Sequence, residues 1–210
     1  MKRTLGVLLI ALGGVLLARC SSLPPWQSVP SGQQAEYGRI ETNDDLIQFL
    51  AFSDAPDISA IAVQNKAYSS PPRYAILLDG SARDAMRTAF EKYEKWKDIA
   101  RDNHTDITKA ITTLELQQMY YLDGAWHDAG DRELSLIFNS ATDDNGAQGF
   151  SLALRPSPLH WRAFYRVYGR ESLVLSDDQV KPFSDLLSES AVEGGYQKAK
   201  KKQDAIDMFH

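Results

Sequence analysis

The strongest periodic pattern in the chain is a helical one near the middle of the sequence. Over about five turns, apolar residues recur at steps of three and four and charged residues take the positions between them, which is typical of a helix with one buried face. We expect a helix over about 82–102, docked on a sheet through Phe90, Tyr93 and Trp96. Its start, Ser81-Ala82-Arg83-Asp84, has the form of a capping box, which predicts the serine as N-cap.

Runs of alternating or continuously apolar residues on both sides of this helix predict β-strands. The predicted strands span 46–52, 58–63, 74–78, 112–122, 133–139, 149–155, 161–168 and 171–175. The first run could instead form a short helix capped by Asn43-Asp44-Asp45. Asp143-Asp144-Asn145-Gly146 favours a tight hairpin turn, since a calcium loop would need a first ligand and a distal Glu that are missing here.

A second helix signal lies near the end of the sequence. Ser176-Asp177-Asp178-Gln179 has the capping-box form and precedes a short apolar face. Pro182 either kinks this helix or starts a new one. Gly194-Gly195 is expected to break the chain and leave a basic tail over 194–210.

Together these elements predict an α+β fold. We expect a mainly antiparallel sheet or β-sandwich, with one long helix over about 82–102 packed on it and a short C-terminal helix. The regular alternation of strands and helices that a parallel sheet needs is missing. The pattern fits one domain over 36–193, preceded by a flexible tether over 21–35 that is rich in Pro, Ser, Gly and Gln.

The first twenty residues have the features of a secretory signal peptide. Lys2 and Arg3 form a positive start, and residues 4–18 form an uncharged, mostly apolar run. This run is too short to cross a bilayer, which needs about 20 apolar residues. Export to an envelope compartment is therefore the expected fate of the chain.

The end of this leader, Leu17-Ala18-Arg19-Cys20, resembles the lipobox of bacterial lipoproteins. The resemblance implies that Cys20 is lipidated and becomes the first residue of the mature protein. Arg19 departs from the family, which has a small residue at that position. Ordinary signal cleavage in this region, giving a soluble periplasmic protein, and a retained anchor stay open as alternatives. Ser21 resembles a sorting signal for the outer membrane.

Charge and cysteine content narrow the classes of partner. Without the leader the chain has 20 basic against 28 acidic residues, a net charge of −8. Such a charge argues against nucleic acid, whose phosphates need a basic surface, and is compatible with a basic protein partner. Cys20 is the only cysteine, so the mature domain has no internal disulfide.

Catalytic and metal-binding motifs are not evident in the sequence. A nucleophile elbow and a phosphate-binding glycine loop are both missing. His127, Asp128 and Asp131 form the only local group of metal-ligand residue types, and a solvated loop is the expected role of that segment. We therefore expect no cofactor and no metal.

The predicted strand over 159–168 offers the best candidate for a partner-binding surface. Side chains alternate across a strand, so one face carries apolar residues suited to a core. The other face carries a stripe of basic and aromatic residues, which are enriched at binding hot spots. These residues are His160, Arg162, Phe164, Arg166 and Tyr168. A solvent face whose arginines pair with neighbouring carboxylates is the alternative.

These observations predict a membrane-anchored periplasmic lipoprotein, located in the outer membrane, that is not an enzyme. Its expected role is to bind another protein of the cell envelope, as immunity proteins and accessory proteins of secretion or envelope assembly do. The alternative is a periplasmic hydrolase that acts on the cell wall or a glycan, because catalytic residues can come together from distant parts of a sequence.

Overall fold

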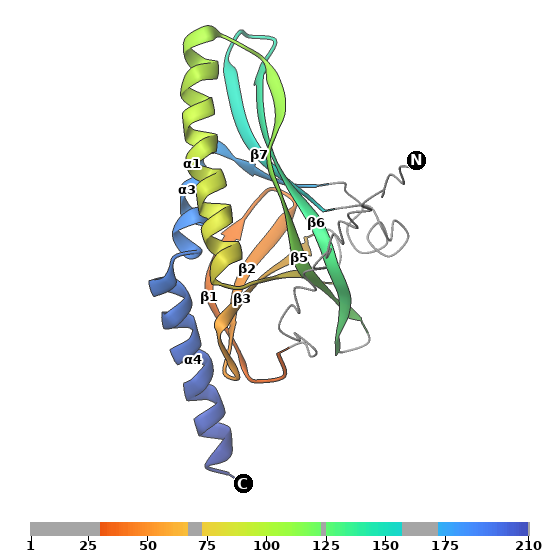
Figure 1. The fold of residues 1–210 in the computed structure, drawn as a ribbon, viewed down its shortest axis with the longest axis vertical. Helices are drawn as coiled ribbons and strands as arrows, with labels where there is room; N and C mark the ends of the chain where they lie inside the picture. Colours follow the sequence, from red (N-terminus) through yellow and green to blue (C-terminus); the bar gives the residue numbers. More distant parts are fainter. Residues whose placement is uncertain (1–29, 67–72, 123–124, 157–171, 210) are drawn as a thin grey trace, which may run out of the picture.

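A computed structural model describes residues 30–66, 73–122, 125–156 and 172–209. Within these residues the fold is α+β: one antiparallel sheet of eight strands, in which each strand pairs with the next along the chain, and three helices (Figure 1). The strands are β1 (Gln34–Glu41), β2 (Asp45–Phe52), β3 (Ala55–Asn65), β4 (Arg73–Leu78), β5 (Ile107–Leu122), β6 (Ala125–Thr142), β7 (Gln148–Pro156) and β8 (Leu173–Ser176). The helices are α1 (Gly80–Asn103), α3 (Asp177–Leu186) and α4 (Glu189–Asp207). The antiparallel α+β prediction is confirmed, as a single sheet.

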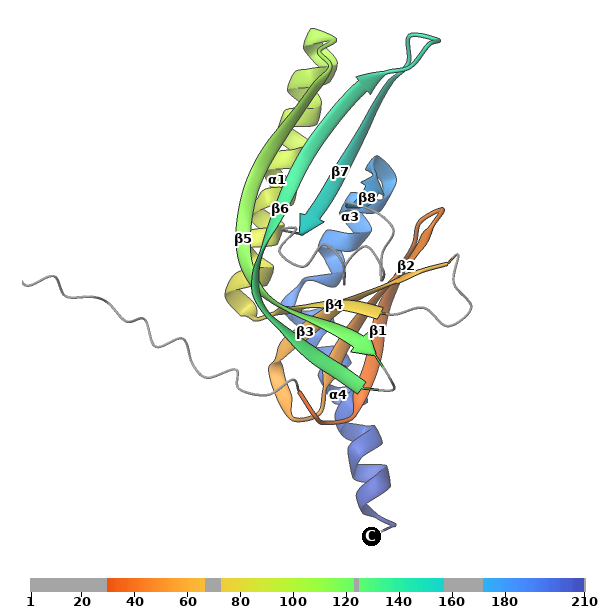
Figure 2. The same ribbon diagram turned by 90° about the vertical axis from the view of Figure 1, so that its right-hand side faces the viewer.

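The two longest strands, β5 and β6, have 16 and 18 residues and bend strongly along their length (Figure 2). Their pairing register shifts twice, between Ala110 and Thr112 and between Gln118 and Met119. Such bulges add twist and curvature to a strand pair. Because of this bend, the half of the hairpin that contains Ile107 follows α1 (Figure 2). The other half, which contains Gln118, pairs with β4 and continues the sheet.

All three helices cover the same face of the sheet, and the main core lies between them (Figure 1). A second, smaller apolar cluster lies on the opposite face of β2, β3 and β4, with Met119 of β5. It contains three small residues, Ala60, Ala62 and Ala75, which are all almost fully buried. Apolar positions on both faces explain why β3 and β4 have continuous rather than alternating apolar sequences.

Helix α1 docks on the sheet as its periodicity predicts. Phe90 and Tyr93 are buried, and Trp96 is partly buried with its ring 5.9 Å from that of Phe138. Burial, with the nearby carboxylate of Asp177, raises the pKa of Tyr93. The protonated Tyr93 hydroxyl therefore donates a hydrogen bond of 3.0 Å to Asp177 Oδ1, which links α1 to the start of α3.

The predicted start of α1 is wrong by two residues. Asp79, not Ser81, is the N-cap: its Oδ1 accepts hydrogen bonds from the Ala82 amide at 2.7 Å and from the Ser81 hydroxyl at 2.9 Å. Asp and Ser are both good N-cap residues, and Gly80, which lies between these two, is the first residue of the helix. The second capping box is confirmed, with the Ser176 amide donating to Gln179 Oε1 at 3.0 Å.

The C-terminal segment differs most from the sequence prediction. Helix α3 continues through Pro182 to Leu186, and α4 continues through Gly194-Gly195 to Asp207. The break expected at the glycine pair does not occur, and the basic residues expected in a tail lie on a helix. α4 packs on β1, β2 and β3, so the structure has two long helices rather than one.

Most described strands agree with the predictions within about three residues at each end, but β5 begins at Ile107 rather than at 112, and β6 begins at Ala125 rather than at 133. The hairpin turn over 143–146 is confirmed. Asp143 Oδ1 accepts hydrogen bonds from the amides of Asn145 and Ala147, and these bonds lower its pKa. Strand β1 was not predicted, and it begins inside the expected tether. The predicted strand over 161–168, the leader and most of the tether lie outside the described residues. Among the helices described, none is long and apolar enough to cross a membrane.

Candidate functional site

The residues predicted from the sequence as functional all lie outside the described part of the chain. Cys20 belongs to residues 1–29, and the basic and aromatic stripe over 160–168 belongs to residues 157–171. Lipidation of Cys20 and partner binding through the stripe therefore stay predictions. The candidate site that the structure offers is elsewhere.

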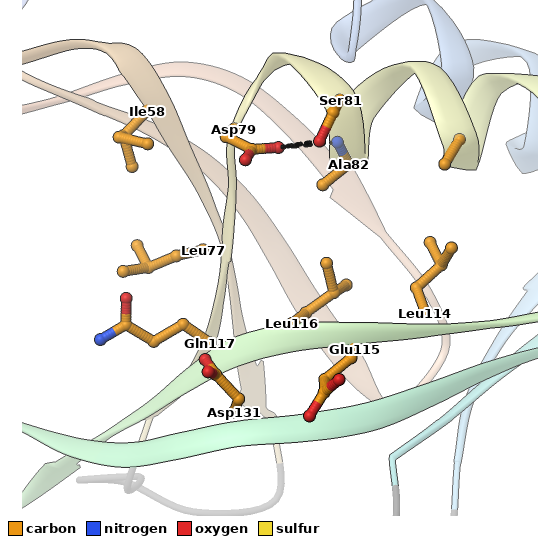
Figure 3. Close-up of a pocket in the computed structure, with 11 residues that line it drawn as sticks. Ile58, Leu77, Asp79, Ser81, Ala82, Leu114, Glu115, Leu116, Gln117 and Asp131 are labelled. Carbon is orange, nitrogen blue, oxygen red and sulfur yellow. Dashed lines mark hydrogen bonds between the residues drawn. The ribbon is translucent and has the colours of Figure 1, made fainter. Parts of the chain in front are cut away.

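A cleft of about 320 Å³ lies between the start of α1 and strands β4 and β5 (Figure 3). One wall comes from the β4–α1 junction, and the opposite wall comes from four consecutive residues of β5, with Asp131 of β6. The lining residues used below are Leu77, Asp79, Ser81, Leu116, Glu115 and Asp131.

The cleft exists because β4 and β5 are paired along only part of their length. Their pairing covers only Arg73–Ile76 of β4, and the last partner on β5 is Gln118. Beyond that point β4 ends and the chain turns into α1, while β5 continues as the partner of β6 alone. The edge of β5 from residue 114 to residue 117 therefore faces the cleft without a neighbouring strand. An unpaired strand edge is a template for pairing with another chain.

The wall at the start of α1 is held in place by side chains that are already hydrogen-bonded. Asp79 caps the helix, and the buried guanidinium of Arg83 donates to the carbonyl oxygens of Asp57 at 2.9 Å and Leu78 at 3.1 Å. These bonds fix the β4–α1 junction against β3. This wall is therefore rigid, and Ser81, whose hydroxyl donates to Asp79, has a capping neighbour rather than a catalytic base.

The opposite wall is acidic. Glu115 of β5 and Asp131 of β6 line it, and Glu133, which is not among the lining residues, is the direct cross-strand partner of Glu115. The three carboxylate residues are exposed, and none of them forms an ion pair with a described residue. Like charges directly opposite on a sheet destabilise it. The pair of Glu115 and Glu133 therefore does not stabilise this part of the sheet.

A second hollow lies at the far end of α1 and has a different character. It is lined by apolar residues that include Ile99 and Ile107, both exposed, and by Trp96. Lys92 and Lys109 each place their ammonium about 5 Å from the centre of the Trp96 ring. Both lysines therefore form cation–π contacts with the Trp96 ring.

The expected solvated loop around His127 is instead part of strand β6. The His127 ring stacks on Tyr120 at 5.1 Å, and Asp128 Oδ1 accepts a hydrogen bond from the Gly130 amide at 2.7 Å. Gly130 has a φ of +74°, which fits the bulge at this point of the strand pair. In the described part of the chain, no group of three His, Cys, Asp or Glu residues is placed to hold a metal ion.

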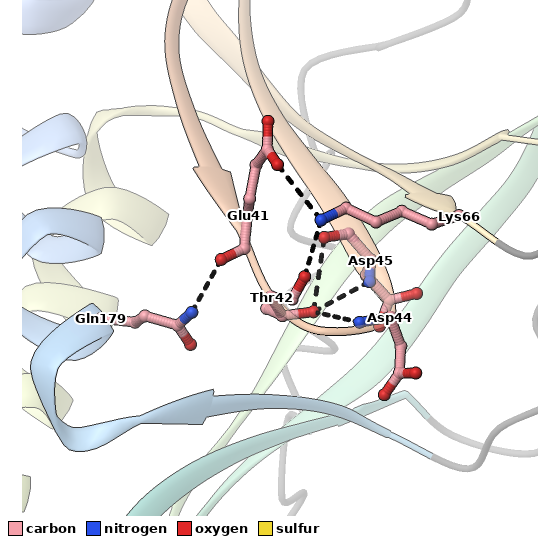
Figure 4. A network of polar contacts seen from close by, with 6 residues as sticks. All are labelled: Glu41, Thr42, Asp44, Asp45, Lys66 and Gln179. Atoms are coloured by element: carbon pink, nitrogen blue, oxygen red, sulfur yellow. Dashed lines mark hydrogen bonds and ion pairs between the residues drawn. The ribbon is translucent and has the colours of Figure 1, made fainter.

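A further polar cluster surrounds the β1–β2 turn (Figure 4). Lys66 donates to the Thr42 carbonyl at 2.8 Å and to the Glu41 carboxylate at 3.2 Å, while the Thr42 hydroxyl accepts from the Asp45 amide at 2.9 Å. Gln179 of α3 donates to the Glu41 carbonyl at 2.9 Å. These bonds close the turn and tie α3 to the sheet edge, so the role of the cluster is structural.

The acidic cleft was not found from the sequence. Its one local signal is that Glu115 and Glu133 each stand on the polar side of a predicted strand, but only the pairing register brings them together. No protein-family model, no curated protein and no solved structure matches this chain.

Proposed function

We propose that the protein is a lipid-anchored, non-catalytic lipoprotein of the bacterial cell envelope that binds a basic segment of a partner protein in the cleft. The observation that carries the binding proposal is the free edge of β5 beside carboxylates that form no ion pair with a described residue. An extended peptide can add to a strand edge through main-chain hydrogen bonds. The carboxylates of Glu115, Asp131 and Glu133 then select lysine or arginine side chains on that peptide.

The anchor in this proposal is Cys20, supported by the lipobox-like end of the leader. A tethered protein searches for partners near one membrane, so a modest intrinsic affinity suffices because the local concentration of the partner is raised. The overall acidity of the mature chain supports a basic partner in the same way that the cleft does.

The binding proposal is tested by a pull-down from envelope extract with a variant that carries Glu115→Gln and Asp131→Asn. These changes keep the size of the side chains and remove two charges from the cleft. We expect partner capture to fall by about tenfold or more, because close charge pairs at interfaces carry coupling of at least about 1.5 kcal/mol. Raising the salt concentration should weaken capture by the parent protein more than capture by the variant.

The matched control is a variant with Glu91→Gln and Asp102→Asn. Both residues are exposed on α1 outside the cleft, so this variant also loses two negative charges but keeps those of the cleft. Equal loss of capture by both variants would contradict a role for the cleft and leave only an effect of net charge. A third variant, Arg162→Glu with Arg166→Glu, tests the predicted stripe, and loss there alone would move the binding site to that segment.

A periplasmic hydrolase is the alternative, and what favours it is that Glu115 and Asp131 line the same cleft, apart from the helix cap Asp79. Glycoside hydrolysis uses a carboxylic acid and a carboxylate on opposite sides of the bond. Purified parent protein that cleaves cell-wall glycan, with activity lost in Glu115→Gln, would establish this alternative and overturn the non-catalytic proposal.

A further inference from the structure

The C-terminal half of α4 projects beyond the sheet, at the opposite end of the molecule from the β6–β7 hairpin (Figure 1). Up to Ala199 the helix still has buried residues against the sheet, whereas every residue from Asp204 to Phe209 is exposed. A helix that ends free of its own domain leaves its side chains available to another surface.

The projecting part combines four lysines and apolar residues with two acidic residues, Asp204 and Asp207, and Lys200 lies 3.6 Å from the Asp204 carboxylate. Lys198, Lys200, Lys201 and Lys202 lie within five positions, with no acidic residue between them. The tip then carries three exposed apolar side chains within four positions: Ile206 at 38 %, Met208 at 78 % and Phe209 at 88 % exposure. Lysines behind an apolar tip are the pattern of helices that sit in the interface of anionic membranes.

The tether to Cys20 begins at the same end of the domain. Lys202 Nζ donates a hydrogen bond of 3.1 Å to the carbonyl oxygen of Gln34, the first residue of β1. The chain that leads back from β1 to Cys20 therefore leaves the domain beside the projecting helix. A membrane that holds Cys20 is therefore tethered to this end of the domain.

Lengths allow the tip and the anchor to reach the same bilayer. Cys20 lies ten residues before Pro30, the first described residue, and ten residues of chain can span at most about 35 Å. From Lys202 the helix and its last residues extend only about 10 Å to Phe209, at about 1.5 Å per residue. The tether is longer than this projection, so it permits contact, and it is short enough to hold the tip close to the lipid surface.

We infer that residues 198–209 form a second membrane contact, which rests on the proposed lipid anchor. The occupant of this surface is the bilayer that holds the acylated Cys20. The lysines lie over anionic phosphate headgroups, and Met208 and Phe209 enter the boundary between headgroups and acyl chains. The contact fixes the orientation of the domain and points the β6–β7 hairpin away from the membrane.

The test uses the acylated full chain reconstituted in phosphatidylcholine vesicles, with and without phosphatidylglycerol. Acylation occupies Cys20, the only cysteine, so an introduced cysteine can carry an environment-sensitive fluorophore. One protein carries Asp207→Cys near the tip, and its control carries Asp144→Cys in the β6–β7 turn, which removes the same charge from another exposed position. On anionic vesicles we expect blue-shifted emission and quenching by spin-labelled lipid for Asp207→Cys alone.

Charge dependence gives the second readout. Lys198→Gln with Lys201→Gln removes two exposed lysines that form no ion pair with a described residue. Each lysine near an anionic surface changes the ratio of docked to free tip by about fivefold, so the double variant should lower it by about 25-fold. On vesicles without phosphatidylglycerol, the double variant should change the ratio of docked to free tip only slightly.

Two results would overturn the inference while the anchor stands. One is acylated, vesicle-bound protein whose label at position 207 emits like the label at position 144. The other is a label at position 207 that is shielded from aqueous iodide but not quenched by spin-labelled lipid, which would place the tip on protein instead of lipid. A chain that carries no acyl group would overturn the anchor and this inference together.

Discussion

Phe183→Ala is expected to lower the thermal midpoint of unfolding by about 6–20 °C. Phe183 is fully buried on α3, with its ring 4.9 Å from that of Phe49 on β2 and 5.5 Å from that of Phe90 on α1, both in edge-to-face geometry. One side chain thus holds the sheet and two helices together. Truncation of a buried Phe costs about 3–5 kcal/mol, and each kcal/mol shifts the midpoint of a chain this size by about 2–4 °C.

The control for this prediction is Phe209→Ala, which removes the same side chain from an exposed position. In the absence of membranes it should melt within about a degree or two of the parent, because exposed substitutions usually change stability by less than about 0.5 kcal/mol. If Phe183→Ala also melts like the parent, α3 is not held by this aromatic cluster. Differential scanning calorimetry of the parent, Phe183→Ala and Phe209→Ala measures the three thermal midpoints.

The adjacent glycines of α4 should respond in opposite ways to alanine. A Cβ on Gly195 would lie 2.5 Å from Cδ1 of Tyr37 and 3.0 Å from the Cβ of Ala51, whereas a Cβ on Gly194 would meet nothing within 4 Å. Alanine improves helix propensity by about 1 kcal/mol at both positions. Overpacking against the ring of Tyr37 costs about 1–3 kcal/mol at one of them only.

We therefore expect Gly194→Ala to raise the free energy of unfolding by up to about 1 kcal/mol. Gly195→Ala should unfold about 1–3 kcal/mol more easily than Gly194→Ala, because the propensity gain cancels in this comparison and the clash remains. Urea titrations of both variants measure the difference. Equal stability of the two would mean that α4 does not pack on β1 at this point.

The same glycine pair explains why the C-terminal helix was not predicted. A Gly-Gly pair normally ends a helix, and the sequence carries no local sign that Gly195 lies against Tyr37, more than 150 positions earlier. The close approach of α4 to the sheet requires a residue without a side chain there. Tertiary packing therefore overrode the local preference, which a reading of the segment alone cannot foresee.

Strand β1 was missed for a related reason. Its sequence, QAEYGRIE, has few apolar residues, because β1 is an edge strand with polar side chains such as Glu36 and Arg39 on its wet side. Strands with apolar residues on one or both faces, such as β3 and β4, were predicted within a few residues. Periodicity reports burial, so it detects central strands better than edge strands.

The acidic cleft shows why a functional site can escape prediction from the sequence. Each of its residues was visible in the sequence, and Ser81 and Asp131 were considered for other roles. The cleft depends on the point at which β4 leaves β5 and on the register that sets Glu115 opposite Glu133. Both are long-range properties of the sheet, and nothing in a strand's own residues encodes where its neighbour stops.

The most direct test of the account is the intact mass of the protein extracted from the membranes of the bacterium that makes it. Both the envelope function and the orientation inferred from α4 depend on the anchor at Cys20. We predict a mature chain that begins at Cys20 and carries the added mass of covalently bound lipid. A mature chain that begins after Cys20, or one that retains Cys20 without any lipid mass, would contradict the account.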